Sequence, residues 1–184
     1  MNLGLRSLAC AALIALSITA AKSDEPQLGG WVDQQAPGFY RLRIGEFRIT
    51  ALSDGTASRD LPKIMSKSSE VSAAFAASHE ELPTEVSINC FLVDTGARRI
   101  LVDTGAGALF GERSGRLVSN MRAAGYDPDK IDAILLTHIH GDHSGGLTVA
   151  GKRIFPKALV YVDRRDAEHW LSSPGCEPAI ALPA

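Results

Sequence analysis

The clearest pattern in the chain is an alternation of apolar and polar residues on either side of a two-residue turn. The segment YRLRIGEFRITALSDG alternates from residue 40, and Gly45-Glu46 interrupts it with turn residues. Successive side chains of a strand point to opposite faces, so this pattern predicts a β-hairpin that covers one side of a core. The predicted apolar face consists of Tyr40, Leu42, Ile44, Phe47 and Ile49.

Three other segments have the composition and spacing of helices. The first, over SSEVSAAFAASHEEL, has Ser68 or Ser69 as its cap and leaves His79 solvated at its polar end. The second ends at Gly125, which suits a C-terminal cap because glycine has no Cβ atom. The third begins after a capping aspartate, Asp163.

Apolar runs between the helices predict further strands. EVSINCFLVDTGARRILVDTG predicts a second hairpin with its turn near Gly96-Ala97, and Cys90 packs inside its first strand. DAILLTH (132–138) and ALVYV (158–162) are apolar on both faces, which is typical of a sheet covered by helices. Antiparallel strands followed by strands that alternate with helices predict a layered α/β domain with helices outside a sheet.

Composition and charge predict an N-terminal signal peptide and argue against nucleic acid or a membrane as a stable partner. The 184-residue chain suits one domain, and its scattered charges, with a formal net charge of −2, predict no nucleic-acid surface. Residues 1–21 combine a basic Arg6, an apolar stretch and small residues, which predicts a secretory signal peptide. The stretch is shorter than the roughly 20 residues of a membrane span, so we expect a secreted or periplasmic protein without stable membrane association. Residues 22–38 predict an extended arm.

The sequence LVDTG occurs twice and offers one candidate chemistry. Asp94 and Asp103 each precede Thr-Gly, as in the catalytic turn of aspartic proteases, which bring two such turns together. Nine positions apart on one hairpin, they cannot form that pair within the chain, although a homodimer could supply one each. The alternative role for Asp94 is to cap a turn. Asp103 ends a buried strand, and its alternative role is to hydrogen-bond a neighbouring loop that carries metal ligands, as an outer support.

The second candidate chemistry lies in the segment THIHGDHSGG, which holds three of the chain's five histidines. On an extended continuation of the preceding strand, His138 and His140 project the same way. Gly141 then turns the chain and brings Asp142 and His143 to a second position. This arrangement predicts two adjacent metal ions, which can hold a hydroxide between them as a nucleophile at neutral pH.

The same segment matches the HxHxDH signature and resembles the metallo-β-lactamase superfamily, whose fold is an αββα sandwich. The resemblance extends from about residue 36 to 172. Within the superfamily, the sequence is similar to the secreted branch that contains methyl parathion hydrolase, whose relatives include lactonases and arylesterases. It implies that residues 39–172 are the N-terminal part of a metallo-β-lactamase-fold domain. The implied activity is hydrolysis of a phosphotriester, aryl ester or lactone by a metal-bridging hydroxide.

The resemblance also implies a role for particular residues. His138 and His140 bind the first metal, while Asp142, counted among the catalytic residues, and His143 bind the second. Zinc is the first expectation, with manganese, cobalt or iron as alternatives. The aromatic side chains that match the leaving-group pocket, or else simply pack in the core, are Phe110 and Trp170. His169 matches no ligand position and is expected to be exposed.

The family draws its remaining ligands from a second half, and this sequence contains no matching histidine or aspartate. Residues 173–184 depart from the family pattern, and their prolines oppose a helix, so we interpret the sequence as an N-terminal half with a truncated, frameshifted or naturally short tail. We then expect an apolar face of the sheet to be exposed, and such a face could pair two copies of the chain as a homodimer. The alternative to an enzyme is an inactive fragment that binds at most one metal weakly.

Overall fold

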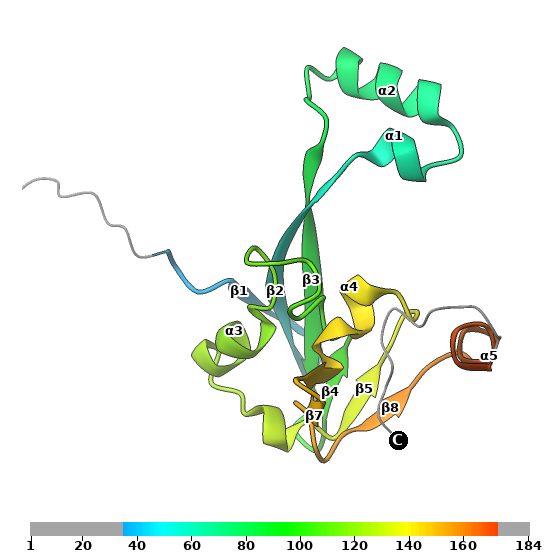
Figure 1. The fold of residues 1–184 in the computed structure, drawn as a ribbon. Coiled ribbons are helices and arrows are strands. Elements are labelled where there is room, and N and C mark those ends of the chain that lie inside the picture. Colours follow the sequence, from blue (N-terminus) through cyan, green and yellow to red (C-terminus); the bar gives the residue numbers. More distant parts are fainter. Residues whose placement is uncertain (1–34, 173–184) are drawn as a thin grey trace, which may run out of the picture. The chain divides into compact units, whose positions relative to one another are not determined.

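The computed structural model describes residues 35–172 (Figure 1). The chain divides into one unit of residues Met1–Gln35 and a second of residues Ala36–Ala184, to which the elements below belong. The predicted signal peptide, most of the predicted arm and the tail at 173–184 lie outside the described residues. Among the residues described, no helix has the length and apolar character needed to cross a bilayer.

Six strands form one mixed sheet in the order β1-β2-β3-β4-β5-β8. Strands β1 to β4 pair antiparallel, whereas β4, β5 and β8 pair parallel. Two further strands, β6 and β7, form a separate ladder. The strands are β1 (Phe39–Ile44), β2 (Phe47–Arg59), β3 (Thr84–Asp94), β4 (Arg99–Val102), β5 (Ala133–Leu135), β6 (Thr148–Val149), β7 (Lys152–Arg153) and β8 (Leu159–Tyr161).

Helices connect these strands, so the predicted α/β class is confirmed. Two of them, α1 and α2, link the ends of β2 and β3, and α3 follows β4 along the chain (Figure 1). The helices are α1 (Leu61–Ile64), α2 (Ser68–Ala77), α3 (Leu117–Ala123), α4 (Gly141–Ser144) and α5 (Arg164–Ser172), with 3-10 turns η1 (Pro128–Lys130) and η2 (Gly145–Leu147).

Turn and cap residues explain most of the boundaries. Both predicted hairpins are present, with β1 pairing β2 across Gly45-Glu46 and β3 pairing β4 across the turn at 95–98. Gly125 has a φ of 82°, the left-handed conformation expected just beyond the end of α3. The Asp163 carboxylate accepts a hydrogen bond from Arg165 N at 2.8 Å, at the start of α5. These predictions are therefore confirmed.

The predicted cap of α2 is wrong. The N-cap is Lys67, and its side chain makes no capping hydrogen bond. Ser68 and Ser69 already lie in the first helical turn, and a residue with helical backbone angles cannot cap the turn to which it belongs. His79 is exposed beyond the end of α2, as the sequence predicts.

One row of side chains across the sheet forms the centre of the core. The register aligns Thr50, Leu92, Leu101 and Ile134 on adjacent strands, and each is fully buried. Helix α3 contributes Leu117 and Met121 to the same hydrophobic cluster as these strands. Cys90 is also fully buried on β3, as its sequence context predicts.

The opposite face of the sheet is exposed. The neighbouring row aligns Phe91, Val102, Leu135 and Tyr161. In this row Phe91 is 44% exposed, Leu135 41% and Tyr161 51%. The apolar face of the first hairpin, expected to cover a core, is exposed as well; its large side chains are Tyr40, Leu42, Ile44 and Phe47. Within residues 35–172, helices therefore cover one face of the sheet. The second cover predicted from DAILLTH and ALVYV is not present among these residues.

Candidate metal centre

The histidine segment begins where β5 ends and the chain leaves the sheet. His138 and His140 follow β5, His140 has extended backbone angles, and α4 begins at Gly141, which turns the chain as predicted. The structure brings His138, His140, Asp142 and His143 together on one side of this turn. The ring centroids of His138 and His143 are 4.0 Å apart.

The four side chains approach one another as two pairs of donor atoms. Nε2 of His138 lies 3.0 Å from Nδ1 of His140, and Nε2 of His143 lies 3.4 Å from Oδ2 of Asp142. Two ligands on one tetrahedral zinc ion, with bonds of about 2.0–2.1 Å, are separated by about 3.3 Å. Both separations are near that value, so each pair has the spacing of two neighbouring ligands.

These pairs fit a metal in chemistry and spacing but not in number. Imidazole nitrogen and carboxylate oxygen are common ligands of zinc and its neighbours. Within residues 35–172, however, no group of three or more His, Cys, Asp or Glu side chains is arranged to hold an ion. The described residues therefore form two half-shells, each with two donors.

Asp103 holds one of these candidate ligands, His143, in a defined orientation. Its buried carboxylate accepts hydrogen bonds from Thr137 N at 2.8 Å and from Nδ1 of His143 at 2.8 Å. With the proton on Nδ1, the Nε2 atom of His143 keeps its lone pair and faces Asp142. Asp103 also has a φ of 59°, a strained conformation for a residue with a side chain. It thus contacts the neighbouring loop, as its position at a strand end suggests.

The neighbouring groups favour an uncharged His138. Burial lowers the pKa of His138, and the adjacent His143 and His140 lower it further, against the opposing influence of Asp103 and Asp142. A neutral imidazole is the form that can donate an electron pair to a metal.

Two glycines allow the loop after β4 to approach the histidine segment closely. A Cβ atom on Gly145 would lie 2.3 Å from Ala106 O, and one on Gly146 would lie 2.0 Å from Thr104 O. Real side chains cannot occupy such positions. Thr104 N also donates to His143 O at 2.7 Å, which ties the two segments together.

Asp54 is a supporting residue that the sequence analysis did not single out. Its fully buried carboxylate accepts hydrogen bonds from Ala106 N, Gly115 N and Leu117 N at 2.9, 3.1 and 3.0 Å. It therefore fixes the loop between β4 and α3 that packs on the histidine segment. The available signal was an aspartate on the buried face of β2, two residues after Leu52.

Both predicted pocket aromatics lie beside the histidine segment. The ring of Trp170 contacts His140 edge-on, with centroids 5.4 Å apart. A Cβ atom on Gly141 would lie 3.6 Å from Cζ of Phe110, whose ring also faces the Arg59 guanidinium at 4.2 Å. His169 is exposed, as expected.

The two LVDTG aspartates do not meet. Asp94 pairs with Arg99 at one end of the β3–β4 ladder, whereas Asp103 follows Val102 at the other end. Asp94 caps its turn by accepting a hydrogen bond from Gly96 N at 2.9 Å, as predicted. No intrachain carboxylate pair of the aspartic-protease kind exists between them.

Comparison with known proteins decides the family. A sequence model of the Metallo-beta-lactamase superfamily matches residues 83–178, which is more than half of the chain and includes the whole histidine segment. The chain belongs to the metallo-beta-lactamase superfamily. This family match agrees with the mixed sheet, and its matched range includes THIHGDHSGG.

Solved structures support the same fold. The hydrolase AbOPH of the beta-lactamase superfamily is 38% identical, with a TM-score of 0.69 over 78% of this chain and 50% of its own. AidC, a dizinc quorum-quenching lactonase in complex with an N-acyl homoserine product, is 27% identical, with a TM-score of 0.66 over 74% of this chain and 48% of its own. Ribonuclease TTHA0252 of Thermus thermophilus is 41% identical over 63 residues, which are 34% of this chain and 14% of the ribonuclease. This chain therefore spans about half the length of the two solved relatives.

Proposed function

We propose that this chain supplies two half-shells of a dinuclear metal centre in a hydrolase of small-molecule esters. His138 and His140 hold one divalent ion, and Asp142 and His143 hold the other. The observation that carries the proposal is the spacing of the two donor pairs, 3.0 Å and 3.4 Å. Bound there, divalent ions supply Lewis acidity and lower the pKa of a coordinated water.

The protein's own groups orient this site. Asp103 fixes the tautomer of His143 through Nδ1, which directs the electron pair of Nε2 toward the ion. Asp103 is joined to the histidine segment a second time through Thr137 N. Zinc is the first choice of metal because AidC is a dizinc enzyme, and manganese, cobalt and iron are the alternatives.

The proposed substrates are phosphotriesters, aryl esters or lactones, with an enzyme of the methyl parathion hydrolase branch as the finer assignment. Phe110 and Trp170 flank the histidine segment and offer flat apolar surfaces for a leaving group. The similarity to the hydrolase AbOPH and to the lactonase AidC supports this substrate class. Export to the periplasm or medium is proposed from residues 1–21.

Metal stoichiometry tests the proposal directly. Purified chain is titrated with zinc against a chromophoric chelator, beside a His138→Ala, His140→Ala double variant and a His169→Ala control. We expect two ions per chain, one ion in the double variant, and two in the control, whose exposed histidine lies outside the donor pairs. With two described donors per ion, binding should be weaker than at closed sites with three or four.

The same titration distinguishes the alternative, an inactive fragment that binds at most one ion. Equal zinc binding by the wild type and the double variant would contradict the proposed ligands. In a full-length relative of this chain, a strong chelator should abolish turnover and added divalent metal should restore it, while an aspartic-protease inhibitor has no effect. Turnover that persists in strong chelator rules out the metal-dependent mechanism.

A further inference from the structure

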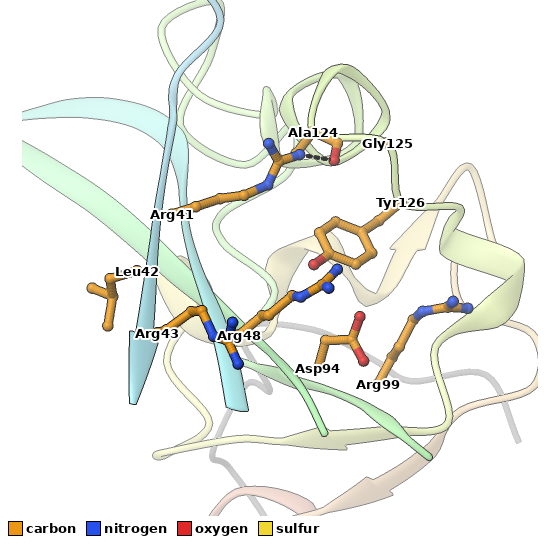
Figure 2. Close-up of a pocket in the computed structure, with 9 residues that line it drawn as sticks. All are labelled: Arg41, Leu42, Arg43, Arg48, Asp94, Arg99, Ala124, Gly125 and Tyr126. Atoms are coloured by element: carbon orange, nitrogen blue, oxygen red, sulfur yellow. Dashed lines mark hydrogen bonds between the residues drawn. The ribbon is translucent and has the colours of Figure 1, made fainter. Parts of the chain in front are cut away.

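A second candidate site lies at the other end of the sheet. A cavity of about 640 Å³ opens between the first strands and the end of α3 (Figure 2). Its lining is rich in arginine; the charged residues are Arg41, Arg43, Arg48, Asp94 and Arg99. The rise of about 3.3 Å per strand residue puts it about 13 Å from Asp103, along the four residues of β4. It is therefore separate from the metal centre.

The strand register builds this cluster. Arg43 lies opposite Arg48, Arg48 opposite Asp94, and Asp94 opposite Arg99, so one row crosses β1 to β4. Residues in one such row share a face of the sheet. Figure 2 shows the side chains of Arg48 and Arg99 extending toward the segment that carries Tyr126, with the Asp94 carboxylate between them in this view.

One of the four arginines has a structural role. The Arg41 guanidinium donates a hydrogen bond to Ala124 O at the end of α3 and lies 4.8 Å from the centre of the Phe39 ring. Helix ends with free carbonyl groups favour such cations. Arg41 is thus accounted for by the packing of β1 against α3.

The other three arginines lack matching anions. Within the part of the chain that the structure describes, no carboxylate lies within 4 Å of the Arg43, Arg48 or Arg99 guanidinium group. Asp94 is the one acidic side chain in the cavity lining, and its Oδ1 atom accepts from Gly96 N. The Ala124 carbonyl that binds Arg41 is uncharged, so the four arginines and one aspartate of the lining leave an excess of three positive charges.

A buried donor in the same cluster has no partner. Nε of Arg99 is inaccessible to solvent and makes no hydrogen bond. Leaving a buried donor unpaired costs about 1–3 kcal/mol, and more for a charged group. Thr50 Oγ1, opposite Arg41 on β2, is also buried without a partner. The guanidinium of Arg99 is therefore held in the cavity lining without a protein acceptor at Nε.

We propose that this cavity binds the phosphate group of a small phosphorylated molecule. Guanidinium groups present several N–H donors in a planar fork that matches phosphate oxygens. The excess of positive charge in the lining favours an anion such as a phosphomonoester dianion. A volume of about 640 Å³ exceeds what inorganic phosphate fills and lies within the range of small-molecule pockets, so the ligand carries an organic group as well. The proposal does not depend on the function proposed for the metal centre.

Equilibrium dialysis of the full chain at low ionic strength tests this site. The probes are radiolabelled inorganic phosphate and adenosine monophosphate, with a chelator present to prevent binding through metal ions. We expect saturable binding of both, tighter for the nucleotide. Arg48→Gln and Arg99→Gln should each weaken it about tenfold, the typical effect of removing a charge-assisted hydrogen bond. Arg164→Gln, which removes an equal charge from exposed α5, should leave it unchanged.

Asp94→Asn keeps the test decisive if an arginine variant fails to fold. Asparagine retains the acceptor for Gly96 N but removes the negative charge, so phosphate should bind more tightly than to the wild type. Unchanged or weaker binding in Asp94→Asn overturns the proposal. So does an equal loss in Arg164→Gln, which indicates attraction to net charge alone. Binding to vesicles of anionic lipid without binding of either soluble probe indicates a membrane surface and overturns it too.

Discussion

The carboxylate of Asp103 and the imidazole of His143 form a hydrogen bond in which Oδ2 lies 2.8 Å from Nδ1. The two residues are far apart in the sequence, and they meet because parallel pairing of β4 with β5 aligns the ends of these strands. The bond leaves Nε2 of His143 as the atom that faces Asp142. An outer carboxylate of this kind both orients a ligand and raises its basicity.

Asp103→Asn should therefore weaken metal binding without unfolding the chain. Asparagine tolerates the positive φ of this position, but a neutral amide stabilises the His143 orientation less well. We expect zinc affinity to fall about 10- to 100-fold in chelator competition. Asp94→Asn, at the opposite end of the β3–β4 ladder, serves as the matched control and should bind zinc like the wild type. Equal affinity in all three proteins would show that Asp103 is a structural residue only.

Trp170 should influence substrate choice in a complete enzyme that contains this segment. Its ring contacts His140 edge-on and offers an apolar surface to a nitrophenol leaving group. Trp170→Ala should lower kcat/KM for aryl phosphotriesters and aryl esters more than for small aliphatic lactones, while the control His79→Ala, exposed beyond α2, changes neither. Equal losses across the three substrates indicate that Trp170 acts through packing.

Asp54 should be a major determinant of stability. Its carboxylate is the acceptor for three backbone N–H groups, which Asp54→Ala would leave buried and unpaired. We expect the free energy of unfolding to fall by about 3 kcal/mol or more, measured by urea denaturation followed by circular dichroism. Glu112→Gln, in the same loop but exposed, should change it by less than about 0.5 kcal/mol. A loss of similar size in both variants would contradict the role given to Asp54.

The Cys90 thiol should be unreactive in the folded protein. Burial raises the pKa of Cys90 well above its ordinary range, and the charges of Asp54 and Asp103 raise it further. In the unfolded chain the thiol ionises near a pH of about 8.5, so the contribution of Cys90 to stability is complete below that pH and declines above it. Alkylation at pH 8 followed by peptide mapping should label Cys90 after denaturation but not before. Rapid labelling of native Cys90 would show that the β3 core opens readily.

The exposed apolar row should cause self-association. Phe91, Leu135 and Tyr161 lie in one row on the open face of the sheet, and such patches favour association. We expect dimers or larger species in size-exclusion chromatography with light scattering, and a shift toward monomer in a Phe91→Ser, Leu135→Ser variant. Leu92→Ser is the contrasting variant, because Leu92 faces the buried side and its loss should unfold the chain. A wild type that stays monomeric at high concentration contradicts this expectation.

The sequence by itself determined most of the local structure and the identity of the candidate ligands. Alternation around Gly45-Glu46 predicted the first hairpin, because a strand's side chains alternate between its faces regardless of what covers them. The spacing in THIHGDHSGG brought its four candidate ligand residues together, because two short steps and one turn keep them within a few ångströms. These features depend on contacts between near neighbours in the chain.

Tertiary structure alone decided which faces are buried and which distant groups meet. Apolar alternation marks Tyr40, Leu42 and Ile44 as one face but does not show whether another layer covers it, and here they are exposed. Asp54 lies on the buried face of β2, and only the folding of the loop after β4 supplies the three backbone donors that it binds. In the arginine row from β1 to β4, the two hairpins pair Arg43 with Arg48 and Asp94 with Arg99, whereas the pairing of Arg48 with Asp94 joins segments that are distant in the sequence. A turn sets the pairing within a hairpin, but no turn joins β2 directly to β3, so that pairing is decided only when the two strands lie side by side.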